Sequence, residues 1–315
     1  MMNLKDELKG LKSVAVSGHI RPDGDCVGST MAVYLYLRKN MPDIDTHIYL
    51  EKPADIFDVI KDIDKIEPAE DVDREFDAFI CIDCSKDRLG AAEKIFDKAK
   101  KTINIDHHIT NSGDGDVNYI DADASSASEL VYDVLDKDKL DIEIAKALYI
   151  GIIHDTGVLQ YSCVSPKTLV TTSELIKYGF DFPALIHSTF YEKTYLQSQI
   201  LGRALLESFL MLDGKVSVSC VDRKMMEFYQ VEPYDLDGIV NQLRYIRGVE
   251  VSIFMYQLAT MEYKVSLRAG GKVDVSKIAA KFGGGGHIRA AGCTMRGSFY
   301  DAVNNIAAEI EAQLK

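Results

Sequence analysis

Short apolar runs alternate with segments of helical periodicity in the first half of the chain. The strand-like runs are SVAVSGH, THIYL, FDAFICID and KTINID, and the segments near 26–38 and 91–100 carry apolar residues at helical spacing. Because parallel strands must be joined by crossovers, this alternation predicts a parallel sheet with helices on both faces. Further helices are expected near 126–135, 142–153 and 166–178.

The pattern changes after about residue 179, where glycine, proline and few strong helix formers predict a linker over 181–195. Beyond it come the strand KVSVSCV, a helix near 237–246, and the runs VEVSIFMYQ and EYKVSLRA, which a short turn at 258–262 should join as a hairpin. An amphipathic helix ends the chain. We therefore expect an α/β domain over 1–180 and a smaller α+β domain over 196–315, since 315 residues exceed one usual core.

Aspartates and histidines follow four apolar runs of the first domain. Because the carboxyl ends of parallel strands share one edge of a sheet, residues distant in sequence can meet there. The residues concerned are His19, Asp23 and Asp25 after SVAVSG, Asp83 after FICI, Asp106, His107 and His108 after INI, and Asp155 after ALYIGIIH.

Four converging carboxylates repel one another, and their pKa values rise unless cations compensate. Two imidazoles with four carboxylates suit two octahedral divalent ions, and histidine nitrogen favours Mn²⁺ over Mg²⁺. Each element also has a simpler interpretation: RPDGD is a turn signal, Asp83 could cap a helix, the histidine pair could lie on the surface, and Asp155 could simply end a helix. Their coincidence after four runs favours metal binding.

Composition limits the partners. With 36 basic and 49 acidic residues the net charge is −13, which disfavours a long duplex polyanion but allows a small anionic substrate in a local positive pocket. No secretory segment or bilayer-length apolar run is seen, so we expect a soluble cytoplasmic protein without membrane partners. Cys81 and Cys84 form one CxxC without a second pair, which favours small buried side chains over a zinc site.

The motifs HIRPDGDCVGS, CIDCS, DHH and GIIHDTG resemble, in order, the four signatures of the DHH phosphoesterase family. FGGGGHIRAAG resembles the signature of its DHH-associated C-terminal domain, so the resemblance covers almost the whole chain. The most similar subgroup is the bacterial nanoRNase type, an oligoribonuclease that also removes the 3′-phosphate from 3′-phosphoadenosine 5′-phosphate (pAp). The resemblance implies a hydrolase that acts by two-metal hydrolysis, with two Mn²⁺ ions as cofactors.

The resemblance also implies individual roles. His19 and Asp23 would hold one ion, Asp25, His107 and Asp155 the other, and Asp83 would bridge them. Asp83 and His108 would be the catalytic residues, with His108 facing the scissile phosphate, and Asp106 would orient a ligand histidine. Water would attack phosphorus in line, without a covalent enzyme intermediate.

The second domain is expected to clamp the substrate. The glycine run from 283 to 286 permits conformations in which consecutive N–H groups point at one anion, although most such runs are merely flexible. The resemblance implies that the far phosphate of a short nucleotide is held by Arg268, Gly284, Gly285, Gly286, His287 and Arg289. Such a clamp would explain a preference for short oligoribonucleotides and small nucleotides.

Several residues have competing interpretations. Ser125 and Ser126 in ASSASELV could bind substrate, or Ser126 with Glu129 could form a capping box. We expect His154 and His187 to be structural and His47 to lie in a strand. The tyrosines at 34, 36, 245 and 256 are expected in a core or an interface.

Two other functions remain open on the sequence. The same metal site could serve a phosphodiesterase for linear or cyclic dinucleotides such as pApA, pGpG or c-di-AMP. A regulatory module could instead bind nucleotide and metal without turnover, although a full ligand set argues against it. A homodimer is compatible with the sequence, which does not determine the oligomeric state.

Overall fold

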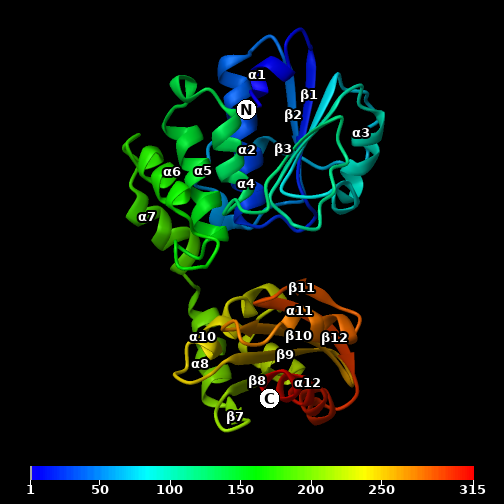
Figure 1. The fold of residues 1–315 in the computed structure, drawn as a ribbon, viewed down its shortest axis with the longest axis vertical. Coiled ribbons are helices and arrows are strands. Elements are labelled where there is room, and N and C mark those ends of the chain that lie inside the picture. Colours follow the sequence, from blue (N-terminus) through cyan, green and yellow to red (C-terminus); the bar gives the residue numbers. More distant parts are fainter. Residues whose placement is uncertain (1) are drawn as a thin grey trace. The chain divides into compact units, whose positions relative to one another are not determined.

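The computed structural model describes residues 2–315, which form two compact units (Figure 1). Unit 1 is Met1–Glu192 and unit 2 is Lys193–Lys315. Within residues 2–315, no helix is both long enough and apolar enough to cross a membrane.

Unit 1 contains a parallel sheet of six strands in the order β3-β2-β1-β4-β5-β6, as expected for an α/β fold. The two central strands, β1 and β4, have only apolar residues in their interiors because both of their faces are covered. The strands are β1 (Ser13–Ser17), β2 (Asp45–Tyr49), β3 (Ile66–Glu67), β4 (Ala78–Ile82), β5 (Thr102–Asp106) and β6 (Val117–Ile120).

Helices cover both faces of this sheet. Val14 and Val16 of β1 face a core that also contains residues of α2, α4 and α5, whereas Ala15 faces a second core with residues of α3. The helices are α1 (Leu4–Glu7), α2 (Gly24–Asn40), α3 (Glu93–Lys98), α4 (Ala127–Val134), α5 (Ile142–Asp155), α6 (Pro166–Ile176) and α7 (Phe182–Ile186). Short 3₁₀ turns are η1 (Asp55–Phe57), η2 (Ile63–Lys65), η3 (Lys86–Arg88), η4 (Gly90–Ala92) and η5 (Lys137–Lys139).

The segment 181–195, expected as a linker, is largely helical. It contains α7 and a π-helical turn, η6 (His187–Tyr191), both within unit 1. Asp181 caps α7, because its carboxylate accepts the N–H of Ala184 at 3.0 Å, and Pro183 is tolerated in the first turn. The boundary between the two units lies between Glu192 and Lys193.

Unit 2 has a mixed sheet of six strands in the order β11-β12-β10-β9-β8-β7, in which β8 and β9 pair in parallel. The expected hairpin is confirmed, since β9 and β10 pair antiparallel. The strands are β7 (Phe209–Met211), β8 (Val216–Val221), β9 (Val251–Ala259), β10 (Glu262–Ala269), β11 (Gly285–His287) and β12 (Ala290–Arg296).

Both faces of the second sheet are also covered. Val251, Ile253 and Met255 of β9 belong to a core that includes residues of α11 and α12, and Phe254 belongs to a core with residues of α8 and α10. The helices are α8 (Tyr195–Leu206), α9 (Arg223–Tyr229), α10 (Ile239–Arg244), α11 (Val275–Lys281) and α12 (Phe299–Leu314), with the 3₁₀ turn η7 (Pro233–Leu236). Tyr34 and Tyr36 are buried as expected, but Tyr245 ends α10 with 58 % of its surface exposed and is not a core residue.

Candidate functional site

The carboxyl ends of β1, β4 and β5 bring His19, Asp83 and His107 together. Asp83 lies between the two imidazoles: its Oδ2 is 3.4 Å from Nε2 of His19, and its Oδ1 is 3.4 Å from Nε2 of His107. Nδ1 of His19 lies 2.9 Å from the carbonyl oxygen of Ile20, which can only accept, so this nitrogen donates and the lone pair is on Nε2 in the neutral ring. Both rings therefore present Nε2 to the same carboxylate.

Two further carboxylates meet His107. Its Nε2 is 3.4 Å from Oδ2 of Asp155, the last residue of α5, and 3.9 Å from Oδ2 of Asp25 in the first turn of α2. The ligand atoms of Asp25, His107 and Asp155 all lie within 4.8 Å of one another, and the same holds for His19, Cys26 and Asp83. Two groups of ligands thus adjoin, with Asp83 in contact with His107 of the neighbouring group.

Asp23 has a structural function in addition to its place beside the cluster. It is the N-cap of α2, where its Oδ1 accepts the N–H groups of Asp25 and Cys26, each at 3.1 Å. The same oxygen is 3.7 Å from Nε2 of His19. The turn interpretation of RPDGD and the ligand interpretation are therefore compatible.

The backbone at Asp83 explains how its carboxylate reaches both histidines. The residue follows β4 directly and adopts a left-handed φ of +63°, which is unfavourable for a non-glycine residue. Its N–H donates to the carbonyl of Ile105 at 2.9 Å, which fixes this conformation to the neighbouring strand. Among residues 2–315, Oδ1 of Asp83 is buried without a hydrogen-bond partner, which is costly unless another group binds it.

Asp25 is held by the N-terminus of α4. Its Oδ2 accepts the N–H of Ala127 at 2.6 Å, and its Oδ1 accepts the N–H of Ser128 at 2.9 Å. The first turn of a helix favours an anion in this position because its N–H groups have no partner within the helix. Burial, followed by repulsion from Asp83, nevertheless raises the pKa of Asp25 to about 7.

The pKa values of Asp155 and His107 are shifted as well. Burial and the charge of Asp25 raise the pKa of Asp155 well above its ordinary value. For His107, burial lowers the pKa, but the nearby carboxylates of Asp83 and Asp25 outweigh it and raise the pKa to about 10. Without cations, the site therefore retains protons on groups that would otherwise be free to bind a metal.

Asp106 orients His108. Its Oδ1 lies 2.8 Å from Nδ1 of the His108 ring and also accepts the N–H of His107 at 2.8 Å. Asn111 donates to its Oδ2 at 2.6 Å, so the carboxylate itself is fixed. We expected Asp106 to orient a ligand histidine; the ring that it contacts is that of His108, to which we had assigned the phosphate.

Three glycines allow this packing: Gly24, which the sequence places in the turn of HIRPDGDC, and Gly28 and Gly151, which the sequence analysis did not single out. A Cβ on Gly151 of α5 would lie 1.9 Å from Oγ of Ser128 and 2.8 Å from Oδ1 of Asp25. On Gly28 it would lie 2.6 Å from the carbonyl of Ala147, and on Gly24 2.2 Å from the ring of His154. For Gly28 and Gly151 the available signal was glycine in the interior of a helix, which costs stability unless close approach requires it.

Ser125 and Ser126 both make hydrogen bonds at the start of α4. Oγ of Ser126 accepts the N–H of Glu129 at 3.1 Å and so caps α4. The Glu129 carboxylate accepts the hydroxyls of Ser125 and, at 2.8 Å, of Thr168. The serines therefore have structural partners, although only half of the expected capping box forms.

The remaining histidines and the CxxC agree with structural roles. His154 packs against Phe57 and lies 3.2 Å from the hydroxyl of Thr189, and burial lowers its pKa to about 4. His47 lies in β2, and His187 begins η6. Cys81 and Cys84 are buried with their sulfur atoms 3.6 Å apart.

In unit 2, Arg268 and His287 lie on one line across the sheet. Arg268 of β10 is opposite Ala290 of β12, which is opposite His287 of β11, and side chains of opposite residues project from the same face. Nε of Arg268 donates to Oδ1 of Asn241 in α10 at 3.1 Å. Arg289 follows in the turn between β11 and β12.

The glycine run is more ordered than we expected. The N–H groups of Gly283 and Gly284 donate to the carbonyls of Ala280 and Ala279 at the end of α11, so these two do not point at an anion. Gly285 and Gly286 begin β11, where Gly286 has a φ of +139°. A Cβ on Gly284 would lie 2.1 Å from the carbonyl of Gly292, so the run allows close approach of two backbones.

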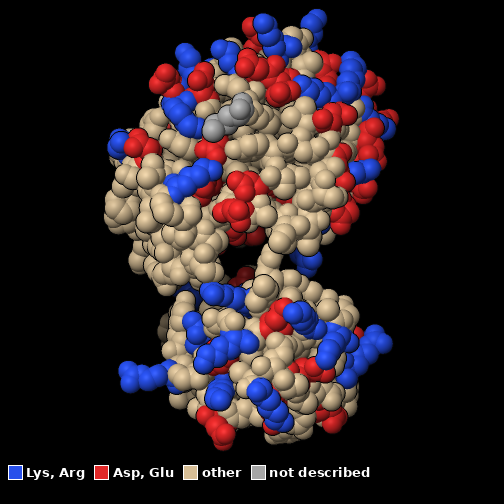
Figure 2. Space-filling model, viewed as in Figure 1, with Lys and Arg blue, Asp and Glu red and all other residues tan. Residues whose placement is uncertain are grey.

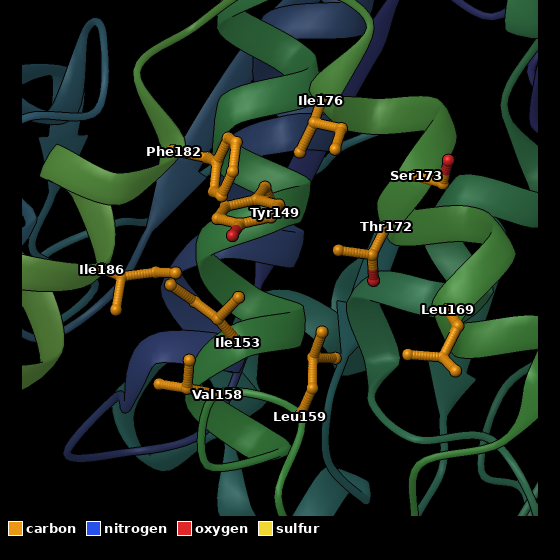
Figure 3. A pocket seen from close by; sticks show the side chains of 10 residues that line it. All are labelled: Tyr149, Ile153, Val158, Leu159, Leu169, Thr172, Ser173, Ile176, Phe182 and Ile186. Atoms are coloured by element: carbon orange, nitrogen blue, oxygen red, sulfur yellow. The ribbon is translucent and has the colours of Figure 1, made fainter.

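An apolar cavity of about 290 Å³ lies elsewhere in unit 1 (Figure 3). Its side chains project from α5, α6, α7 and the turn after α5, and no charged residue lines it. It cannot compensate a phosphate charge. The lining residues are Tyr149, Ile153, Val158, Leu159, Leu169, Thr172, Ser173, Ile176, Phe182 and Ile186.

Comparison with family models gives two matches. Residues 13–152 match the model described as "DHH family, N-terminal domain", and residues 213–315 match the "DHHA1 domain". The first match contains five of the six residues expected to hold metal and the second all residues expected to hold substrate; Asp155 lies just beyond the first.

Comparison with individual proteins gives matches over nearly the full length. The chain is 27 % identical to the "Probable bifunctional oligoribonuclease and PAP phosphatase NrnA" of Streptococcus mutans, covering 91 % of this chain and 90 % of that protein. It is 28 % identical to the "Bifunctional oligoribonuclease and PAP phosphatase NrnA" of Thermus thermophilus, covering 90 % and 84 %. The crystal structure of an exopolyphosphatase-related protein from Bacteroides fragilis has the same fold, with a TM-score of 0.89 at 22 % identity, covering 98 % and 94 %.

Proposed function

Because this chain belongs to the DHH phosphoesterase family and carries a DHHA1 domain, we propose that it hydrolyses short oligoribonucleotides and removes the 3′-phosphate from pAp. The observation that carries this proposal is the position of Asp83. Its buried carboxylate lies 3.4 Å from histidines of two different strand ends, and its Oδ1 has no hydrogen-bond partner among the described residues.

The donor set fits two divalent ions. Ligands at neighbouring positions of an octahedral ion lie about 3 Å apart, close to the separations at Asp83. One ion would be held by His19, Asp23 and Asp83 and the other by Asp25, Asp83, His107 and Asp155. Imidazole ligands favour Mn²⁺ over Mg²⁺. When bound, such ions supply Lewis acidity at the phosphoryl oxygens and a nucleophilic water at neutral pH.

The protein's own groups position the phosphate. Asp106 accepts the Nδ1–H of His108 and so fixes the orientation of the ring. In this proposal Nε2 of the same ring donates to a phosphoryl or leaving oxygen. Unit 1 carries 21 basic and 36 acidic residues and would repel an anion without metal, whereas unit 2 carries 15 basic and 13 acidic residues (Figure 2). We propose that Arg268, His287, Arg289 and the backbone at Gly285 and Gly286 hold the far phosphate, and that Gly284 contributes by allowing close packing against β12.

The test compares Mn²⁺-dependent phosphate release from pAp by the parent protein, Asp83→Asn and Asp87→Asn. Asp87 is an exposed aspartate on the same loop and serves as the matched control. We expect the Asp83 variant to lose at least about 100-fold in rate and the control to retain parent activity. Mn²⁺ binding, followed by the electron paramagnetic resonance of the free ion, should show two ions in the parent and fewer in the Asp83 variant.

Each alternative predicts a different result. Equal rates for parent and Asp83→Asn would exclude this metal mechanism. Mn²⁺ binding without turnover of pAp, RNA trimers, pApA, pGpG and cyclic dinucleotides would indicate a regulatory module. Turnover confined to dinucleotides would change the substrate and leave the site intact.

A further inference from the structure

A hollow of about 280 Å³ lies beside the metal cluster, within unit 1. It is lined by the last residues of β1 and β2 and by residues that follow β1, β2, β3 and β4, so it lies at the carboxyl edge of the sheet, where ligands of open α/β sheets bind. It shares His19 with the cluster. The lining residues are Ser17, Gly18, His19, Ile20, Tyr49, Leu50, Glu51, Lys52, Pro68, Ala69, Glu70, Leu89, Gly90, Ala91 and Ala92.

We propose that this hollow binds the ribonucleoside next to the scissile phosphate and that Glu51 recognises its ribose hydroxyls. The inference rests on the proposed function, because the nucleoside in the hollow would belong to the substrate whose phosphate lies at the cluster.

The charges of the lining disfavour a second phosphate as the occupant. Of its charged residues, Glu51 and Glu70 would repel an anion, and Nζ of Lys52 is paired with Oδ1 of Asp55 at 2.9 Å. The walls contain Ile20, Leu50, Pro68, Ala69 and Leu89, which offer an apolar surface to a heterocyclic base. A neutral ligand with an apolar face and hydroxyl donors fits this lining.

The position of Glu51 points to the ribose. The strand order β3-β2-β1-β4-β5-β6 is the 3-2-1-4-5-6 order of dinucleotide-binding sheets, in which a carboxylate following the second strand hydrogen-bonds ribose hydroxyls. Glu51 follows β2, which ends at Tyr49. HIRPDGDC replaces the glycine-rich phosphate loop of those folds, so only the topological position is shared.

Glu51 is oriented toward the site by the backbone. Its Oε2 accepts the N–H of Arg21 at 2.6 Å, two residues after His19, and Arg21 adopts a left-handed φ of +53°. A carboxylate has about four acceptor positions and no donor, so it can accept hydroxyls while keeping this contact. The 2′-hydroxyl distinguishes RNA from DNA, and this contact would therefore select ribonucleotides.

The test measures kcat/KM of the Mn²⁺-loaded protein for pApA and for its 2′-deoxy counterpart, in the parent and in Glu51→Gln. Glutamine still accepts the Arg21 N–H but loses the charge. We expect the ribo-to-deoxy preference to fall about tenfold, mainly through slower cleavage of pApA. Glu75→Gln, an exposed carboxylate before β4 at the opposite edge of the sheet, should keep the parent ratio.

Binding of nucleosides without phosphate separates this inference from the proposed function. Calorimetry should show that the parent binds adenosine more tightly than 2′-deoxyadenosine and that Glu51→Gln loses this difference. Ala91→Leu adds a larger side chain to the hollow at an exposed position and should weaken the binding of both nucleosides equally. An unchanged ribo-to-deoxy ratio in Glu51→Gln overturns the inference even if the enzyme is active. A lost preference in a protein without turnover would overturn the proposed function instead.

Discussion

The two units collect their polar side chains in different ways. In unit 1 every strand pair is parallel, so residues that directly follow β1, β4 and β5 meet at one edge. In unit 2 most pairs are antiparallel, and Arg268 meets His287 only because the register of β10, β12 and β11 places them on one line. A parallel sheet gathers groups by topology, whereas an antiparallel sheet gathers them by register.

The chemistry follows the same division. The parallel edge gathers carboxylates whose pKa values rise through burial and mutual repulsion, as at Asp25 and Asp155, so protons or cations must compensate their charge. The second sheet offers guanidinium and imidazole groups beside backbone turns, which suit an anion without metal. The positions of the carboxylates in unit 1 depend on close packing of helices. The expected anion site in unit 2 depends on the side chains of single residues.

The largest expected effect is that of Gly151→Ala in α5. The added Cβ would overlap Oγ of Ser128 and Oδ1 of Asp25, so α4 and the Asp25 carboxylate must move. We expect a loss of at least about 100-fold in kcat for pAp and about 1–3 kcal/mol of unfolding free energy. Steady-state kinetics and urea unfolding measure the two quantities.

Gly202→Ala in α8 of unit 2 is the matched control. A Cβ there meets no described atom within 4 Å, so we expect unchanged activity and about 0.5–1 kcal/mol of added helix stability. Full activity in Gly151→Ala would mean that the ligand geometry does not depend on this helix contact.

Metal should stabilise one unit selectively. At 100 times its dissociation constant, Mn²⁺ should add about 2.7 kcal/mol to the opening free energy of unit 1, because it binds only the folded cluster. Hydrogen exchange of peptides from β4 and β5 should slow accordingly, while those from β9 and β10 should not change. Asp83→Asn should abolish the protection; equal protection of both units would contradict a site built within unit 1.

Much of unit 1 could be predicted from the sequence because its information is local. The runs that form β1, β2, β4 and β5 are short and apolar, and the residues after β1, β4 and β5 converge by topology, whereas Asp25 and Asp155 come from α2 and α5. The edge strands β3 and β6 were missed because Ile66–Glu67 and Val117–Ile120 are short and incompletely buried, so their pattern is weak.

Other details depend on three-dimensional contacts that spacing does not encode. Neighbours in DHH contact different groups: Nε2 of His107 lies near Asp155, whereas the ring of His108 contacts Asp106. The glycine run looked like an anion-binding loop, but its first two N–H groups donate to carbonyls at the end of α11. The sequence could not distinguish the two cases, because glycine is favoured both after the end of a helix and in anion-binding backbone turns. Gly151 acquires its role only when α4 and α5 pack together.

The smallest expected effect tests the register of unit 2. Arg268→Ala removes a half-buried guanidinium that donates to Asn241, and we expect KM for pAp to rise about tenfold while kcat changes little, because the group binds ground state and transition state alike. Arg296→Ala is the control: this arginine ends β12 on the same sheet and pairs with Glu262 at 3.1 Å, but its side chain is 86 % exposed. Such a pair contributes little, so KM should stay at the parent value. A large fall in kcat for Arg268→Ala would instead place this arginine at the reacting phosphate. The proposed division, in which unit 1 binds the metal ions and unit 2 only holds the far phosphate, would then be wrong.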